Sequence, residues 1–179
     1  MREIVKLTLL LAVFCAASAG VLAVVSTCTE TARAGVAEAQ RMNAARRVLH
    51  LADGETFRED GTNGIFVAER DGRIVKAAVE CGSANGYGGP IRAIVSATAD
   101  GRILDFAVLE ANETPGLGAK IGSKDFASRL AGMALSSDWR VRRDGGDVDA
   151  ITSATISSRA ACEAVASAAV RLGQIVDNR

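Results

Sequence analysis

A segment rich in hydroxyl and small side chains precedes the last apolar stretch of the chain. Residues 149–158 read Asp-Ala-Ile-Thr-Ser-Ala-Thr-Ile-Ser-Ser, with Thr155 at the point where a helical pattern begins. The first turn of a helix has backbone N–H groups without intrahelical acceptors and carries the positive end of the helix dipole. Such a helix start can bind a phosphate group, to which Thr152 and Ser157 could add hydroxyl donors. The same composition is also typical of an ordinary helix N-cap without a ligand.

Two glycine-rich segments are the other candidates for a binding site. Residues 86–92 read Gly-Tyr-Gly-Gly-Pro-Ile-Arg, and residues 113–120 read Glu-Thr-Pro-Gly-Leu-Gly-Ala-Lys. Glycine permits the backbone to approach another segment or a ligand closely. Pro115 and the glycines around it also predict a tight turn, which is a purely structural role.

The order and spacing of these segments resemble the G subunit of Rnf-type electron-transport complexes. The C subunit of the sodium-pumping NADH:quinone reductase shares the same FMN-binding domain. Residues 149–155 are close to that family's flavinylation motif, Asp-x-x-(Ser/Thr)-Gly-Ala-(Ser/Thr), whose last hydroxyl is esterified by the FMN phosphate. The resemblance covers roughly residues 60–175 and extends to the apolar N-terminal segment. It implies covalent FMN at Thr155, with Ser153 standing where the family usually has glycine.

The resemblance also implies which residues surround the flavin. The loop after Glu113 would line the ring, with backbone N–H groups at the ring edge and Leu117 on its face. Tyr87 would stack on the ring or only anchor its own loop, and Lys120 would add positive charge near the flavin or remain solvated. Besides Thr155, the predicted FMN contacts are Tyr87, Glu113, Thr114, Gly116, Leu117, Gly118, Lys120, Thr152, Ser153, Ala154 and Ile156.

By resemblance, the FMN relays electrons within an Rnf complex that couples electron transfer between ferredoxin and NAD to the transport of sodium ions or protons. The implied partners are other membrane subunits, including a second FMN subunit and iron–sulfur subunits, and a flavin transferase for maturation. The sequence lacks a nicotinamide-binding fingerprint, which favours an electron carrier. A stand-alone extracytoplasmic FMN-dependent reductase and a membrane-anchored structural subunit with an empty site remain as alternatives.

The pattern of turns and apolar residues predicts the elements that would position these segments. Two Asp-Gly turns, each between residues that alternate in polarity, predict successive hairpins and hence an antiparallel sheet. The expected strands are 65–69, 74–79, 91–97 and 103–109, and the expected helices are 30–51, 123–130 with Ser123 as N-cap, and 156–176. Residues 139–142 could form a further short strand.

The first residues of the chain are apolar enough to cross a membrane. Residues 7–25 form an uncharged run of 19, which as a helix would extend roughly 28 Å, close to the hydrocarbon thickness of a bilayer. Small residues at 17–19 would also suit cleavage of a signal peptide, but the apolar run continues to Val25, which favours a retained anchor. Arg2 and Lys6 predict that the N-terminus stays inside, with the domain on the extracytoplasmic side of the cytoplasmic membrane.

The expected fold class is therefore α+β, an antiparallel sheet with packed helices after a single N-terminal transmembrane helix. We expect an anchor at 1–29, a helical stalk at 30–54 and an FMN-binding domain at 55–179.

Composition narrows the possible functions. Basic and acidic residues number 21 each, and no basic face that would bind nucleic acid is evident. The four cysteines lack C-x-x-C spacing, so the sequence predicts no zinc or iron–sulfur site. Cys81 and Cys162 could form a disulfide in an export compartment or serve as small buried hydrophobic residues.

Overall fold

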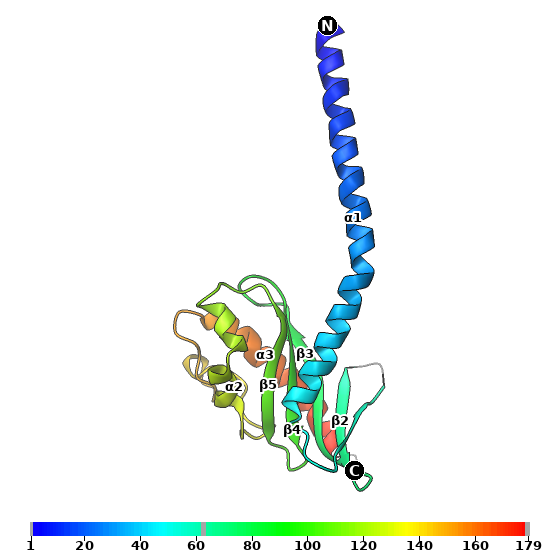
Figure 1. Ribbon diagram of the computed structural model, residues 1–179. Coiled ribbons are helices and arrows are strands. Elements are labelled where there is room, and N and C mark those ends of the chain that lie inside the picture. The colour runs from blue at the N-terminus through cyan, green and yellow to red at the C-terminus, as the bar shows by residue number, and fades with distance from the viewer. Residues whose placement is uncertain (1, 62–63, 178–179) are drawn as a thin grey trace. The chain divides into compact units, whose positions relative to one another are not determined.

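The computed structural model describes residues 2–61 and 64–177, with the main elements labelled in Figure 1. The chain divides into two compact units, residues 1–40 and residues 41–179. The first unit is formed by helix α1 (Arg2–Val48), which continues into the second. Within α1, Arg2–Thr29 is long and apolar enough to span a membrane, and none of its most apolar stretch is buried against protein. That exposure suits a helix surrounded by lipid.

The second unit is built on a sheet of five antiparallel strands, paired in chain order. The strands are β1 (Thr56–Glu59), β2 (Ile65–Arg70), β3 (Arg73–Ser83), β4 (Ile91–Thr98) and β5 (Ile103–Ala111). The two predicted hairpins are confirmed, and β1 is added at the edge. The β2–β3 turn has positive φ at both Asp71, 52°, and Gly72, 74°, as a type I′ turn requires.

Helices α2 (Lys124–Leu130) and α3 (Thr155–Asp177) follow the sheet and confirm the predicted helices. Ser123 is the N-cap of α2, because its Oγ accepts a hydrogen bond from the backbone N–H of Phe126 at 3.3 Å. Two 3-10 helices, Gly118–Gly122 and Arg142–Asp144, lie in the connections before α2 and α3.

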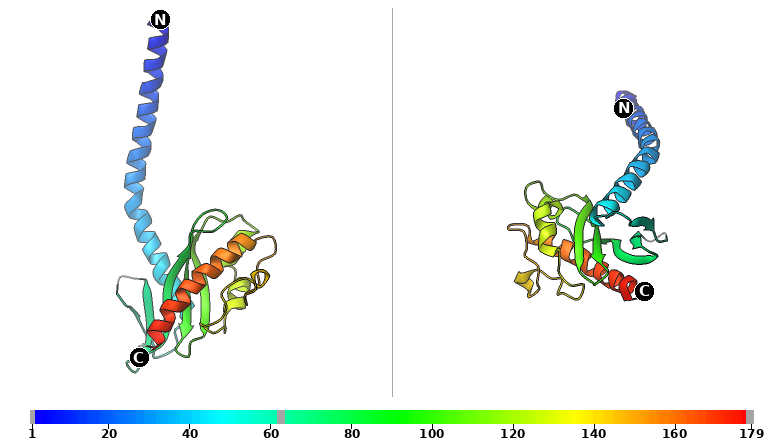
Figure 2. Two further views of the ribbon diagram at one scale, coloured as in Figure 1. Left: turned by 180° about the vertical axis from the view of Figure 1, so that it is seen from behind. Right: turned by 60° about the horizontal axis from the view of Figure 1, so that its bottom comes forward.

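Helices cover both faces of the sheet. Its strands are apolar at nearly every central position, because side chains on both faces are buried. Figure 2 (left) shows α3 crossing one face, where Leu172 and Val165 join the same buried cluster as Val95. On the other face, Val48 at the end of α1 clusters with Phe66. Residues of β2, β3, β4 and β5 contribute to both clusters, because side chains alternate between the two faces along a strand. The result is a rigid platform for the loops at its ends.

Helix α1 is continuous to Val48, as predicted for a helix that continues the apolar N-terminal segment. From Arg41 onward its residues belong to the second unit, and Ala45 and Val48 are fully buried there. The hydroxyl of Ser96 on β4 donates to the carbonyl oxygen of Val48 at 2.6 Å and ties the helix end to the sheet. The folded domain therefore includes the last two turns of the helix that the sequence assigned to a stalk.

The sequence suggests a short strand at residues 139–142, but the chain forms none there. Val141 makes a single bridge to Val148, and the chain then turns through the 3-10 helix Arg142–Asp144. Gly145, with φ of 87°, ends that helix and reverses the chain. Trp139 is packed in the core beside this turn, and its Nε1 donates to the carbonyl oxygen of Leu135 at 3.1 Å.

Leu172→Ala should lower the free energy of unfolding by about 2–5 kcal/mol, because it leaves a cavity between α3 and the sheet. Leu172 is fully buried, whereas Val170 on the same helix is 65% exposed. Val170→Ala is therefore the matched control, with an expected change within about 0.5 kcal/mol. Urea unfolding of the detergent-solubilised chain, followed by Trp139 fluorescence, measures both. Equal destabilisation by the two substitutions would contradict this packing of α3.

Candidate functional site

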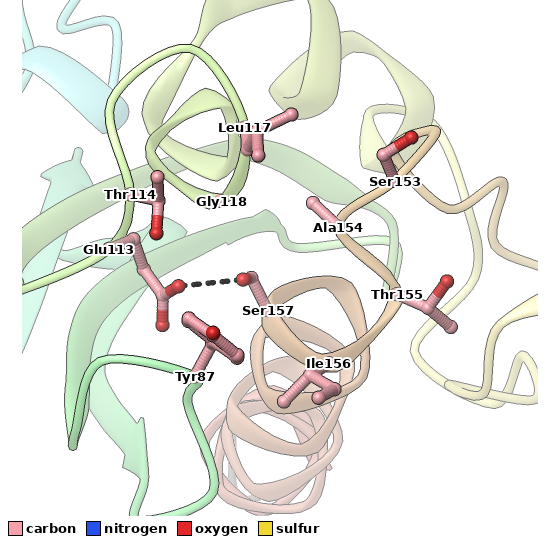
Figure 3. Close-up of a pocket in the computed structure, with 10 residues that line it drawn as sticks. All are labelled: Tyr87, Glu113, Thr114, Leu117, Gly118, Ser153, Ala154, Thr155, Ile156 and Ser157. Atoms are coloured by element: carbon pink, nitrogen blue, oxygen red, sulfur yellow. Dashed lines mark hydrogen bonds between the residues drawn. The ribbon is translucent and has the colours of Figure 1, made fainter.

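Three segments that are far apart in the sequence meet around one cavity. They are the loop between β3 and β4, the loop after β5, and the start of α3. The cavity has a volume of about 490 Å³, within the range of small-molecule sites. Its lining, drawn in Figure 3, consists of Tyr87, Glu113, Thr114, Leu117, Gly118, Ser153, Ala154, Thr155, Ile156 and Ser157.

Glu113 links the three segments. Its side chain belongs to the loop after β5, and the residue is only 8% exposed. Its Oε2 accepts a hydrogen bond from the hydroxyl of Ser157, in the first turn of α3, at 2.7 Å. Its Oε1 accepts a longer one, 3.4 Å, from the backbone N–H of Gly88 in the β3–β4 loop. Burying a carboxylate is unfavourable unless it is hydrogen-bonded, so these contacts hold the loops to the helix.

Glycine is required where the loops approach one another. A Cβ atom on Gly88 would lie 1.7 Å from the carbonyl oxygen of Asn112. One on Gly118 would lie 2.4 Å from Oε2 of Glu113 and 2.5 Å from Oγ of Ser157. All three distances are far below van der Waals contact. The close approach predicted from the glycine-rich sequence is thus contact between protein segments around the Glu113 carboxylate.

The start of α3 is shaped by a turn. The backbone N–H of Ala154 donates to the carbonyl oxygen of Ile151 at 3.0 Å, and Ser153 within this turn has φ of 65°. A positive φ at the third residue of a turn is typical of type II turns, where glycine is favoured. Ala154 then precedes the helix and has no side-chain oxygen to cap it. The residue before α3 thus offers no side-chain acceptor to the first N–H groups of the helix, and Thr155, where the helix begins, lines the cavity.

Arg129 is a part of this region that the sequence did not reveal. From α2, its Nη1 donates to the carbonyl oxygens of Asp149 and Ala150 at 3.0 and 3.1 Å, and its Nη2 pairs with Asp125 at 2.6 Å. The guanidinium therefore fixes the main chain just before the turn that leads to Thr155. No spacing in the sequence indicates this contact, because it depends on how α2 packs beside the loop.

The structure brings nine of the twelve predicted site residues together around the cavity, and the remaining three lie outside its lining. Gly116, with φ of 77°, forms the turn of its loop. Lys120 lies in the 3-10 helix Gly118–Gly122, and Thr152 lies in the turn before Ser153. All three are exposed. Ser157, noted in the sequence only as a possible hydroxyl donor, joins the lining instead.

The lining suits an elongated ligand with an anionic end and a flat apolar body. In the view of Figure 3, Thr155 and Glu113 lie on opposite sides of the cavity. The helix start at Thr155 offers N–H groups and a positive dipole to an anion. Between the two ends, Tyr87, Leu117 and Ile156 expose 69%, 43% and 47% of their surface, which is apolar area for a planar ring. The donor set and the shape of the cavity therefore fit FMN.

The two cysteines of the second unit take no part in this site. Both Cys81 and Cys162 are free thiols, half-buried and buried respectively. Burial raises the pKa of each thiol to about 12. Because the thiolate is the reactive form, these residues serve as small hydrophobic side chains.

Known proteins are similar to this chain in sequence. The family model described as "FMN-binding domain" matches residues 86–170. The chain is 34% identical to the G subunit of the ion-translocating oxidoreductase complex of Salmonella typhi, over 92% of this chain and 89% of that protein. It is 34% identical to the protein of the same name from Vibrio atlanticus, over 97% and 92% of the two chains.

Two solved structures resemble the fold. The C subunit of the Na(+)-translocating NADH-quinone reductase from Parabacteroides distasonis is 25% identical, with a TM-score of 0.53 over 64% of this chain and 63% of that one. NqrC of Shewanella oneidensis is 18% identical, with a TM-score of 0.52 over 75% and 74% of the two chains. The second likeness concerns the fold alone. Together they agree with the α+β architecture expected from the sequence.

Ser153→Gly should raise the free energy of unfolding by on the order of 1 kcal/mol, because glycine adopts a positive φ without the steric penalty of a Cβ atom. Ser153→Ala is the matched control, since it removes the hydroxyl and keeps the Cβ atom. The two variants are compared with the parent chain by urea unfolding. A loss of stability in Ser153→Gly together with a gain in Ser153→Ala would show that the serine hydroxyl, and not the backbone conformation, controls this turn.

Proposed function

The chain belongs to the family of G subunits of ion-translocating oxidoreductase complexes, and on that premise we propose that it carries FMN esterified to Thr155 and relays electrons between other redox centres of the complex. The observation that supports this most directly is the position of Thr155, the first residue of α3, in the wall of a cavity that fits the cofactor. The chain is an electron-transfer subunit with an FMN-binding domain.

Thr155 would act as the attachment point. Its Oγ1 would form the bond to the flavin phosphorus and give up its proton, while the remaining nucleotide of the flavin donor would leave from the same phosphorus. The flavin donor must therefore be an activated flavin nucleotide, supplied with a flavin transferase. The N–H groups at the start of α3 would hold the attached phosphate, because the first N–H groups of a helix lack intrahelical acceptors. Arg129 keeps the preceding main chain in place for this step.

The remaining lining residues would orient the flavin ring. When bound, FMN supplies reversible uptake and release of electrons. Tyr87, Leu117 and Ile156 offer the ring an apolar surface, and their exposure leaves the site shallow. A shallow site suits an electron carrier, since electrons must pass to centres on neighbouring proteins. The ten lining residues include no histidine or cysteine, and their one carboxylate is engaged by Ser157 and Gly88, so they do not favour a separate reductase activity.

The proposed complex couples electron transfer between ferredoxin and NAD to the movement of sodium ions or protons across the cytoplasmic membrane. Its other subunits, including a second FMN subunit and iron–sulfur subunits, would supply the donor and acceptor. The helix Arg2–Thr29 would anchor this subunit by a single crossing. Residues 30–40 would connect the anchor to the extracytoplasmic FMN domain.

Thr155→Ala should abolish covalent flavin, whereas Thr155→Ser should largely keep it because a serine hydroxyl can form the same ester. Thr56→Ala is the matched control, since Thr56 is an exposed threonine on β1 that lies outside both the motif and the cavity lining. The chain is coexpressed with a flavin transferase, denatured and run on a gel, and flavin fluorescence is read under ultraviolet light. The proposed ester would be refuted if Thr155→Ala remained fluorescent. It would also be refuted if boiling in detergent removed the fluorescence from the parent chain.

Arg2 and Lys6 should keep the N-terminus inside, so that the C-terminus lies outside the cytoplasm. A reporter enzyme fused after Arg179 should therefore be active if it requires export and inactive if it requires the cytoplasm. Paired fusions to an export-dependent and a cytoplasm-dependent reporter provide the control. A mature protein that begins at Gly20, identified by N-terminal sequencing, would instead show that the apolar helix is a cleaved signal peptide.

A further inference from the structure

Glu113 is the only acidic or basic residue among the described residues that line the cavity. The other nine are neutral hydroxyl, apolar, glycine or tyrosine residues. A single carboxylate with no cationic side chain beside it in the lining is unusual for a site whose ligand also carries an anionic phosphate. Its position must therefore serve something other than attraction of the ligand.

The carboxylate is held in place from several directions. The hydroxyl of Ser157 donates to it at 2.7 Å, and the backbone N–H of Gly88 donates at 3.4 Å. The Gly88 loop is itself tied to α3, because Asn85 Nδ2 donates to Glu163 at 2.8 Å and the hydroxyl of Ser83 does so at 2.6 Å. These contacts leave the Glu113 side chain little freedom to turn away from the cavity.

The location of the charge determines its effect on a bound flavin. Figure 3 shows Glu113 on the side of the cavity opposite Thr155, so the ring of a flavin esterified at Thr155 would reach toward the carboxylate. A charge at a site that is 8% exposed acts through a lower effective dielectric and is screened less by salt than a surface charge. An anion there opposes the addition of electrons to the ring.

We propose that Glu113, positioned by Ser157 and Gly88, places a fixed negative charge at the flavin cavity that holds the reduction potential of the flavin low. This inference rests on the proposed function. It assigns Ser157 a positioning role, because its hydroxyl acts on the flavin only through the carboxylate. The subunit would thus pass electrons at a potential set by one hydrogen-bonded pair, Glu113 and Ser157.

The test is the midpoint potential of the flavin, measured by spectroelectrochemical titration of the full detergent-solubilised chain. Glu113→Gln removes the charge while the amide can keep hydrogen bonds to both Ser157 and Gly88. Its potential should shift to more positive values, and the shift should persist at high salt. Ser157→Ala keeps the charge but no longer holds the carboxylate toward the cavity, so its potential should shift in the same positive direction by a smaller amount.

Glu110→Gln is the matched control. It removes the same charge three residues earlier, but the Glu110 side chain is 66% exposed and paired with Arg92 at 3.4 Å, so its effect should be small and vanish with salt. The inference would be overturned if the midpoint potential of the flavin in Glu113→Gln were no more positive than that in Glu110→Gln. A further change in potential when Ser157→Ala is added to Glu113→Gln would also overturn it, since Ser157 would then act on the flavin by a route other than the carboxylate.

A second measurement needs no flavin. In a Thr155→Ala chain, Ser157→Ala should speed amide hydrogen exchange at Gly88 and its loop, because the carboxylate that accepts the Gly88 N–H is no longer held. Unchanged exchange would overturn the positioning role of Ser157. Absence of covalent flavin from the parent chain would refute the proposed function, whereas loaded variants with unaltered potentials would refute only the role of Glu113.

Discussion

A buried carboxylate at the meeting point of three segments is the constraint on which the site depends. Glu113 cannot be buried at acceptable cost unless donors reach it, and those donors come from the first turn of α3 and from the β3–β4 loop. The same contact requires glycine at Gly118, and the close approach of the two loops requires it at Gly88, where a side chain would collide with the carbonyl oxygen of Asn112. One hydrogen-bonded group thus determines both the composition of the loops and their distance from the helix.

The rest of the domain keeps the start of α3 at that point. The helix is fixed along its length by apolar packing on the sheet, with residues such as Val165 and Leu172 fully buried. At its beginning, Arg129 holds the preceding main chain through two carbonyl oxygens. Because both the helix and the loops are anchored to the same rigid sheet, the cavity keeps its shape without relying on the ligand. That pre-organisation is what an electron carrier needs to change redox state with little rearrangement.

Much of this could be predicted from the sequence, for local reasons. The Asp71–Gly72 hairpin turn, the Ser123 cap and the 3.6-residue periodicity of α3 are encoded within a few residues, and each was found as expected. The contact between Glu113 and Ser157 joins residues 44 positions apart, so no local pattern indicates it. The resemblance to a flavoprotein family predicted most of the residues that line the cavity. It did not indicate the Arg129 contact, and it did not explain why the family motif favours glycine at position 153. The left-handed conformation of Ser153 supplies that explanation.

The most direct test of the account is the chemical identity of the residue that bears the flavin. Trypsin cleaves after Arg143 and Arg159 and releases one peptide, residues 144–159, which contains five hydroxyl residues. Mass spectrometry of this peptide from the native membrane should show the mass of FMN less one water, and fragmentation should place it on Thr155. An unmodified peptide, or flavin on Thr152, Ser153, Ser157 or Ser158, would contradict the account.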